Sequence, residues 1–197
     1  MRFSHGHTII RIEHDSDCHT CDPRNDYPNV GTMVCFHPRY CLGDANPNVS
    51  PDEYLLQLMQ QREYRLHSKN VPDSIKQKDV QTYINKHYIV LPLYLYDHSD
   101  LSMSVVPFGC PWDSGQVGFI YMDRDSVEYD DPIAGLTAEV ETYNHWLNGD
   151  IYGYIIEDSG GNVVDSCWGF YGVDQCKQEA MHHAEYISAN LATSFVI

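Results

Sequence analysis

Residues 150–169, DIYGYIIEDSGGNVVDSCWG, carry the strongest fold signal in the chain. The four residues Ser159-Gly160-Gly161-Asn162 are a typical hairpin turn, because glycine and asparagine accept the positive φ angles that tight turns require. The segments on either side, 150–157 and 162–169, are rich in β-branched and aromatic residues. These residues therefore predict an antiparallel pair of strands.

The remaining segments alternate strand and helix signals. Further strands are predicted over 8–13, 31–37, 88–96, 101–106 and 116–122, with Pro92 favouring an edge or a bulge. Ser50, Pro51 and Glu53 form a capping box that opens a helix through about Leu66. Other helices are predicted from Pro72 and Asp73, over about 136–147, and from Asp174 to about Leu191.

The order of these elements predicts an α+β fold. We expect a single domain over 1–197, with a mostly antiparallel or mixed sheet of about six or seven strands and about four helices. Residues 45–87 read as a helical, insertion-like segment of this domain.

The charge is uneven along the chain. The formal net charge is −16, and residues 101–197 contain only Arg124 and Lys177 against fifteen Asp and Glu. Residues 1–100 contain ten Lys and Arg against thirteen acids. A phosphate backbone requires clustered cations, so direct binding of nucleic acid is not expected. The balance favours a basic protein partner or a metal, with solubility alone as the alternative.

Seven cysteines lie in a chain whose first residues lack a signal-peptide pattern. We expect a cytoplasmic protein with reduced thiols, and no apolar run is long enough for a membrane helix. Cys18, Cys21, Cys35 and His37 are candidate zinc ligands because of their paired spacing. The alternative is a loop with incidental Cys and His, and no other cofactor is expected.

A second group of residues has the composition of a thiol active site. Asp97 and His98 end a predicted strand, and Cys110, Asp113 and Gln116 follow in a Gly- and Pro-bounded turn. His98 could activate the Cys110 thiol, with Asp97 or Asp113 orienting the imidazole and Gln116 donating to an oxyanion. Ordinary turn chemistry is the alternative.

The acidic half of the chain also has the composition of a binding surface. Tyr and Trp are common interface anchors, and carboxylates among them can pair with the Arg and Lys of a partner. The binding candidates are Trp112, Ser114, Asp123, Asp125, Tyr129, Asp130 and Asp131.

Three stretches, 31–44 (GTMVCFHPRYCLGD), 91–121 (LPLYLYDHSDLSMSVVPFGCPWDSGQVGFIY) and 149–172 (GDIYGYIIEDSGGNVVDSCWGFYG), together resemble a family of small acidic proteins encoded by bacteriophages and other mobile elements. The family is described without an assigned function, and its pattern lacks the pair Cys18 and Cys21. The resemblance implies a phage-type accessory protein acting inside a host cell, where such proteins often inhibit defence or restriction.

The sequence favours a binding protein rather than an enzyme. Its acidic surface would engage a basic host protein. The alternative is a small-molecule or nucleotide site, binding or hydrolytic, around Asp97, His98, Cys110 and Asp113. A zinc-stabilised structural protein is a third interpretation. The partner's identity and the oligomeric state stay open.

Overall fold

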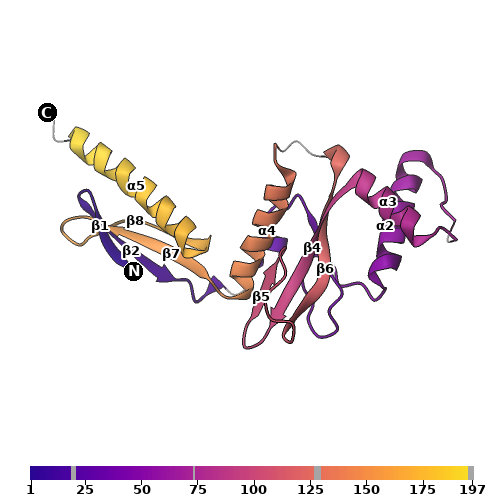
Figure 1. Ribbon diagram of the computed structural model, residues 1–197. Coiled ribbons are helices and arrows are strands. Elements are labelled where there is room, and N and C mark those ends of the chain that lie inside the picture. Colours follow the sequence, from indigo (N-terminus) through magenta and orange to yellow (C-terminus); the bar gives the residue numbers. More distant parts are fainter. Residues whose placement is uncertain (19–20, 73, 127–129, 195–197) are drawn as a thin grey trace. The chain divides into compact units, whose positions relative to one another are not determined.

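The computed structural model describes residues 1–18, 21–72, 74–126 and 130–194 (Figure 1). Within these residues the chain forms five α-helices and eight strands, and the strands are divided between two four-stranded antiparallel sheets. The predicted α+β class is therefore confirmed. The chain divides into two compact units, Met1–Pro23 with His145–Ile197, and Arg24–Asn144.

The unit formed by the two ends of the chain has one sheet and one long helix. Its sheet has the order β1 (Arg2–His5), β2 (Thr8–His14), β7 (Ile151–Glu157), β8 (Val163–Tyr171). Helix α5 (Val173–Ser194) covers one face of this sheet (Figure 1). Its core consists of Ile10, Ile12, Tyr154, Ile156, Cys176, Ala180 and Ala184. The sequence did not predict β1, which pairs with β2 across a turn where Gly6 has a φ of 59°.

The unit Arg24–Asn144 is a sheet between two helical layers. Its sheet has the order β3 (Thr32–Cys35), β6 (Ser114–Asp123), β4 (Tyr88–Asp97), β5 (Leu101–Ser104). Leu136 of α4 (Pro132–Leu147) lies beside Ile120 on one face of the sheet. The opposite face is covered by α2 (Pro51–His67) and α3 (Gln77–His87), with Met59, Val80 and Ile84 packed around Tyr88 and Tyr121. Short helices α1 (Pro23–Asp26) and η2 (Arg124–Ser126) complete the elements.

The predicted helix boundaries agree in part with the structure. The Ser50 hydroxyl accepts the Glu53 N–H at 3.2 Å, which confirms the predicted cap of α2. The second helix begins at Gln77 rather than at Pro72, and Asp73 lies outside the described residues. Among the described residues, no helix is long and apolar enough to cross a membrane.

Strands β4 and β6 pair along almost their whole length. Tyr88 pairs with Asp123 at one end and Tyr96 pairs with Ser114 at the other. Strand β5 pairs with β4 only from Tyr94 onward, so Pro92 lies in a part of β4 without a β5 neighbour. The register shifts between Leu93 and Tyr94, which confirms the bulge expected near Pro92.

A buried arginine joins three segments of the same unit. The Arg24 guanidinium, with 2% of its side chain exposed, pairs with Asp44 at 2.5 Å and with Glu139 of α4 at 2.7 Å. It also donates to the Gly31 carbonyl oxygen at 2.6 Å. Glu139 in turn accepts the Val30 N–H at 2.6 Å. Every charge in this cluster has a partner, so removing the arginine leaves two carboxylates without their main counter-charge.

We predict that Arg24→Ala lowers the free energy of unfolding by about 3–5 kcal/mol, because it leaves Asp44 and Glu139 uncompensated. The exposed Arg124→Ala is the matched control and should change it by less than about 0.5 kcal/mol. Urea denaturation followed by circular dichroism measures both values. Equal effects of the two variants would contradict the role given to Arg24.

The turn of the predicted β7–β8 hairpin is organised by one carboxylate. Asp158 accepts the N–H groups of Gly160 at 2.8 Å and Asn162 at 2.9 Å, and also the Asn162 side-chain amide. These hydrogen bonds, first those of Asn162, lower the pKa of Asp158 below its ordinary value.

We predict that Asn162→Ala raises the pKa of Asp158 toward its ordinary value, as measured by NMR titration of the carboxyl carbon. Because the folded-state pKa is depressed, the hairpin gains stability above the unfolded-state pKa and loses it as the pH falls through the folded-state pKa. Ser159→Ala, in the same turn, is the control. An unchanged Asp158 pKa in Asn162→Ala would refute this assignment.

Candidate binding hollow at the ends of β4 and β6

The pairing of β4 with β6 brings Asp97 next to the turn that contains Cys110 and Asp113. The Asp97 N–H donates to the Asp113 carbonyl oxygen at 2.8 Å. The Ser114 hydroxyl donates to the Cys110 carbonyl oxygen at 2.5 Å. These bonds tie both ends of the turn to the sheet, so its conformation is set by the strands.

The Asp113 carboxylate lies between the two groups of the predicted thiol site. Its Oδ2 is 3.4 Å from Nδ1 of His98 and 3.6 Å from Sγ of Cys110. The His98 ring also stacks on Tyr96, with 6.1 Å between the ring centroids. The structure therefore brings His98 and Cys110 to the same carboxylate, that of Asp113.

The grouping does not have the order that a thiol nucleophile requires. The Cys110 thiol donates to the Asp113 carboxylate, whereas activation requires a nitrogen base that takes its proton. The Gln116 amide donates to the Gly118 carbonyl oxygen at 3.3 Å, on its own strand, instead of pointing to an oxyanion position. These contacts are those of a turn held by its carboxylate.

Arg39, Tyr40 and His37 complete the site from a loop that follows β3. Arg39 forms an ion pair with Asp97, and the Tyr40 hydroxyl lies 3.4 Å from the same carboxylate. The His37 ring stacks on Tyr40 at 4.8 Å, and its Nδ1 accepts the Tyr40 N–H. The sequence singled out His37 only as a candidate zinc ligand. It did not identify Arg39 or Tyr40, because Arg39 is 58 positions from Asp97 and no local pattern connects them.

Beside these residues lies an open hollow of about 400 Å³, whose lining includes neither His98 nor Cys110. It is lined by His37, Arg39, Leu95, Asp97, Trp112, Asp113, Ser114, Gly115 and Val117. Trp112 stands at the hollow with 92% of its surface exposed, more than any other large hydrophobic residue among those described. An exposed indole beside carboxylates and an arginine suits contact with another molecule.

The predicted acidic binding residues have different surroundings from one another. Asp123 and Asp125 both pair with Arg62 of α2, whose side chain is 3% exposed. Asp131 accepts the Ala134 N–H at the start of α4, and Asp130 is exposed. Tyr129 lies outside the described residues. Asp123 and Asp125 therefore compensate a buried cation within the fold.

The acidic half of the chain does not belong to one unit. Residues 101–144 lie in one unit and 145–197 in the other. The unit formed by the chain ends has eleven Asp and Glu against three Lys and Arg, and the unit Arg24–Asn144 has seventeen against nine. The excess of acidic residues is thus equal in the two units, although it is very unequal along the sequence.

In the part of the chain that the structure describes, the four candidate zinc ligands do not come together in one group. Cys18 and Cys21 form a disulfide, which corrects the expectation that all thiols are reduced. Cys35 is a buried free thiol, and burial, followed by the charge of Asp44, raises its pKa to about 12. Among the described residues, no group of three or more His, Cys, Asp or Glu could hold a metal ion.

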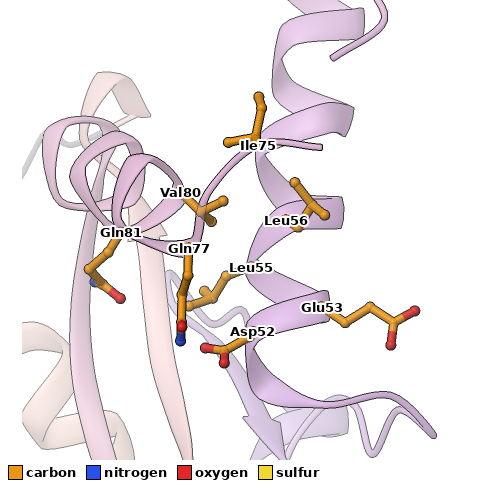
Figure 2. Close-up of a pocket in the computed structure, with 8 residues that line it drawn as sticks. All are labelled: Asp52, Glu53, Leu55, Leu56, Ile75, Gln77, Val80 and Gln81. Carbon is orange, nitrogen blue, oxygen red and sulfur yellow. The ribbon is translucent and has the colours of Figure 1, made fainter. Parts of the chain in front are cut away.

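A second concavity lies between α2 and α3 (Figure 2). Its volume is about 280 Å³, and Leu55, Leu56, Ile75 and Val80 give it an apolar wall. Asp52 and Glu53 lie at the end where α2 begins. None of the residues predicted to carry chemistry lines this groove, so the hollow at Trp112 is the better candidate site.

We predict that Trp112→Ala changes the free energy of unfolding by less than about 0.5 kcal/mol, because this side chain is almost fully exposed. Asp113→Ala should lower it by about 1 kcal/mol, because the turn loses its contacts with His98 and Cys110. Urea denaturation measures both. A large loss of stability in Trp112→Ala would show that the indole serves the fold.

Comparison of the chain with protein-family models, with curated proteins and with solved structures gives no match.

Proposed function

We propose that the protein acts by binding a partner protein, with Trp112 as the anchor and the hollow beside β4 and β6 as the docking site. The observation that carries this proposal is the 92% exposure of Trp112 on a turn that the strands hold in place. Tryptophan is enriched among residues that dominate binding energy, and a side chain presented on an ordered turn loses little freedom on binding.

The charge of the site favours a basic partner. Asp113 lines the hollow, as does Asp97 in its ion pair with Arg39, and Asp100 lies exposed three residues beyond the end of β4. The formal charge of −16 attracts cationic surfaces over long range and repels polyanions. The partner that we propose is a host protein with a basic surface, such as a defence or nucleic-acid-binding protein, in the phage-type setting implied by the resemblance.

This proposal differs from the interpretation of the sequence in the residues that make contact. The sequence favoured Asp123 and Asp125 as part of a large acidic surface, but Arg62 engages both of them. The contact is therefore proposed at Trp112, Ser114 and Asp113.

In the test, benzoylphenylalanine replaces Pro111, which is exposed and precedes Trp112. The variant is photo-crosslinked in a bacterial host lysate. The same group at the exposed Tyr64 of α2 is the control. We expect a protein that is captured from position 111 and not from position 64. Its purified form should bind Trp112→Ala about 30-fold more weakly than the wild type, the loss typical of an interface hot spot.

Two further measurements separate this proposal from non-specific attraction. Tyr64→Ala should bind within twofold of the wild type, and binding by the wild type should weaken at least about tenfold between 0.05 and 0.5 M salt. Equal affinity of Trp112→Ala and wild type would refute the anchor. Binding that does not depend on salt would refute the basic partner.

A further inference from the structure

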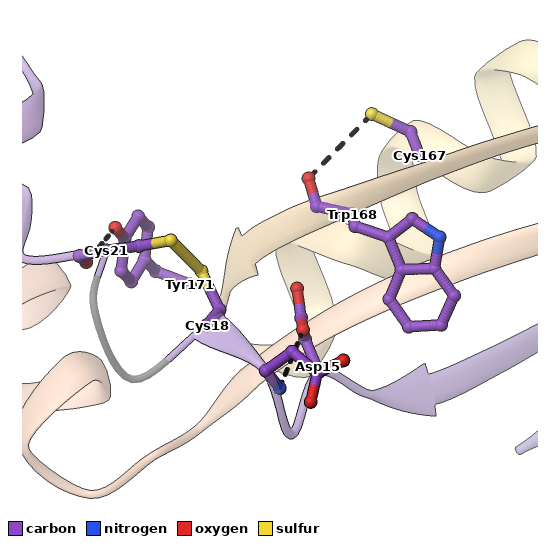
Figure 3. Close-up of a disulfide and its surroundings, with 7 residues drawn as sticks. Asp15, Cys18, Cys21, Cys167, Trp168 and Tyr171 are labelled. Atoms are coloured by element: carbon purple, nitrogen blue, oxygen red, sulfur yellow. Dashed lines mark hydrogen bonds between the residues drawn. A yellow bond between two sulfur atoms is a disulfide. The ribbon is translucent and has the colours of Figure 1, made fainter.

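The disulfide between Cys18 and Cys21 lies in the unit formed by the chain ends, in the loop that follows β2 (Figure 3). Two hydrogen bonds that do not involve the sulfur atoms connect this loop to neighbouring strands. The Asp15 N–H donates to the Ile151 carbonyl oxygen at 2.7 Å, and the Tyr171 hydroxyl donates to the Cys21 carbonyl oxygen at 2.7 Å. The loop is therefore anchored on both sides of the disulfide.

The disulfide adds little restraint to the fold. It joins residues three positions apart, and the stabilisation by a disulfide falls as the loop that it closes becomes shorter. The spacing Cys-x-x-Cys is instead typical of thiols that exchange disulfides, because it favours the thiolate in the reduced form. The pair is thus better suited to redox chemistry than to stabilisation.

The other buried cysteines lack this reactivity. Cys35 and Cys176 are fully buried free thiols, and burial raises the pKa of Cys176 to about 11. A thiol that stays protonated is a poor nucleophile, so these two residues should not compete in exchange reactions.

The two cysteines of the disulfide differ in their exposure to solvent. Cys18 is 7% exposed, whereas Cys21 is partly exposed. Cys18 also lines a cavity of about 500 Å³, together with His14, Asp15, Ser16, Trp146, Leu147, Gly149 and Ile151. An incoming thiol would therefore meet the sulfur of Cys21 first, and the cavity offers an apolar recess for a neighbouring side chain of the reductant.

Three carboxylates lie close to the pair along the sequence. Asp15, Asp17 and Asp22 all lie within three residues of a cysteine of the pair. They repel anionic thiols such as glutathione and favour neutral or cationic ones.

We propose that Cys18 and Cys21 are a thiol–disulfide exchange site whose substrate is a dithiol in a neutral or basic protein segment. The thiolate of the substrate attacks Sγ of Cys21, the bond between the two cysteines breaks, and Cys18 leaves as a thiolate that takes up a proton. The second thiol of the substrate then attacks the substrate's sulfur in the mixed disulfide and releases Cys21. In total, two electrons and two protons pass to the pair, and the substrate becomes a disulfide.

The first experiment titrates the full-length native protein with mixtures of reduced and oxidised dithiothreitol, and reads Cys18 and Cys21 by alkylation and peptide mass spectrometry. We expect a reversible two-electron transition with unchanged far-ultraviolet circular dichroism. Cys35 and Cys176 should stay protected throughout. A pair that never oxidises, or that is reduced only when the protein unfolds, would overturn the proposal.

The second experiment uses the matched variants Cys18→Ser and Cys21→Ser, with Cys18→Ala as a further variant in case the serine perturbs the buried position. Each reduced protein reacts with cystamine, a cationic disulfide, or with oxidised glutathione, an anionic one. We expect Cys21 to form the mixed disulfide at least tenfold faster than Cys18, and cystamine to react faster than oxidised glutathione. Asp17→Asn should reduce the preference for cystamine.

Equal rates at Cys18 and Cys21 would overturn the proposed direction of attack, and equal rates with the two disulfides would overturn the selectivity. The exposed Cys41 and Cys167 serve as internal standards for intrinsic thiol reactivity. Trp112 belongs to the other unit and takes no part in these measurements, so their outcome is independent of the proposed binding function.

Discussion

The antiparallel register of β4 against β6 is the constraint from which the candidate site follows. Tyr96 pairs with Ser114, and this pairing places Asp97 beside Asp113 although sixteen positions separate them in the chain. Gly118 allows β3 to complete the sheet, because a Cβ at this position would lie 1.9 Å from the Val34 carbonyl oxygen. A shift of one residue would turn Asp113 and Trp112 away from the loop that carries Arg39.

Buried arginines connect the first half of the chain, which contains ten of the twelve Lys and Arg, to the acidic second half. Arg24 pairs with Glu139, and Arg62 pairs with Asp123 and Asp125. In the unit formed by the chain ends, Arg2 and Arg11 both contact Glu157 of β7. Within each unit, arginines from the first half of the chain thus neutralise acids from the second half. The acids outside these pairs, among them Asp100 and Asp130, determine how the surface attracts other molecules.

Sequence reasoning succeeded where the signal was local. The turn at 159–162 and the cap at Ser50 each depend on a few neighbouring residues, and both are present. Cys110 and Asp113 are three positions apart in one turn, which made their proximity predictable, whereas His98 reaches Asp113 through the pairing of β4 with β6. The role of Arg39, the pairing of Arg62 with Asp123 and the division into two sheets could not, because each depends on contacts between segments far apart in the chain. The spacing of Cys18 and Cys21 indicated proximity, but it did not distinguish a metal site from a disulfide.

The exposure of Trp112 has a thermodynamic consequence for any complex that buries it. An indole that is 92% exposed orders a large shell of water, and this water is released when a partner covers the ring. The heat capacity of the system therefore falls on association, and the enthalpy of association becomes more negative as the temperature rises. The difference in this temperature dependence between the wild type and Trp112→Ala would thus record the burial of the indole even before the structure of a complex is known.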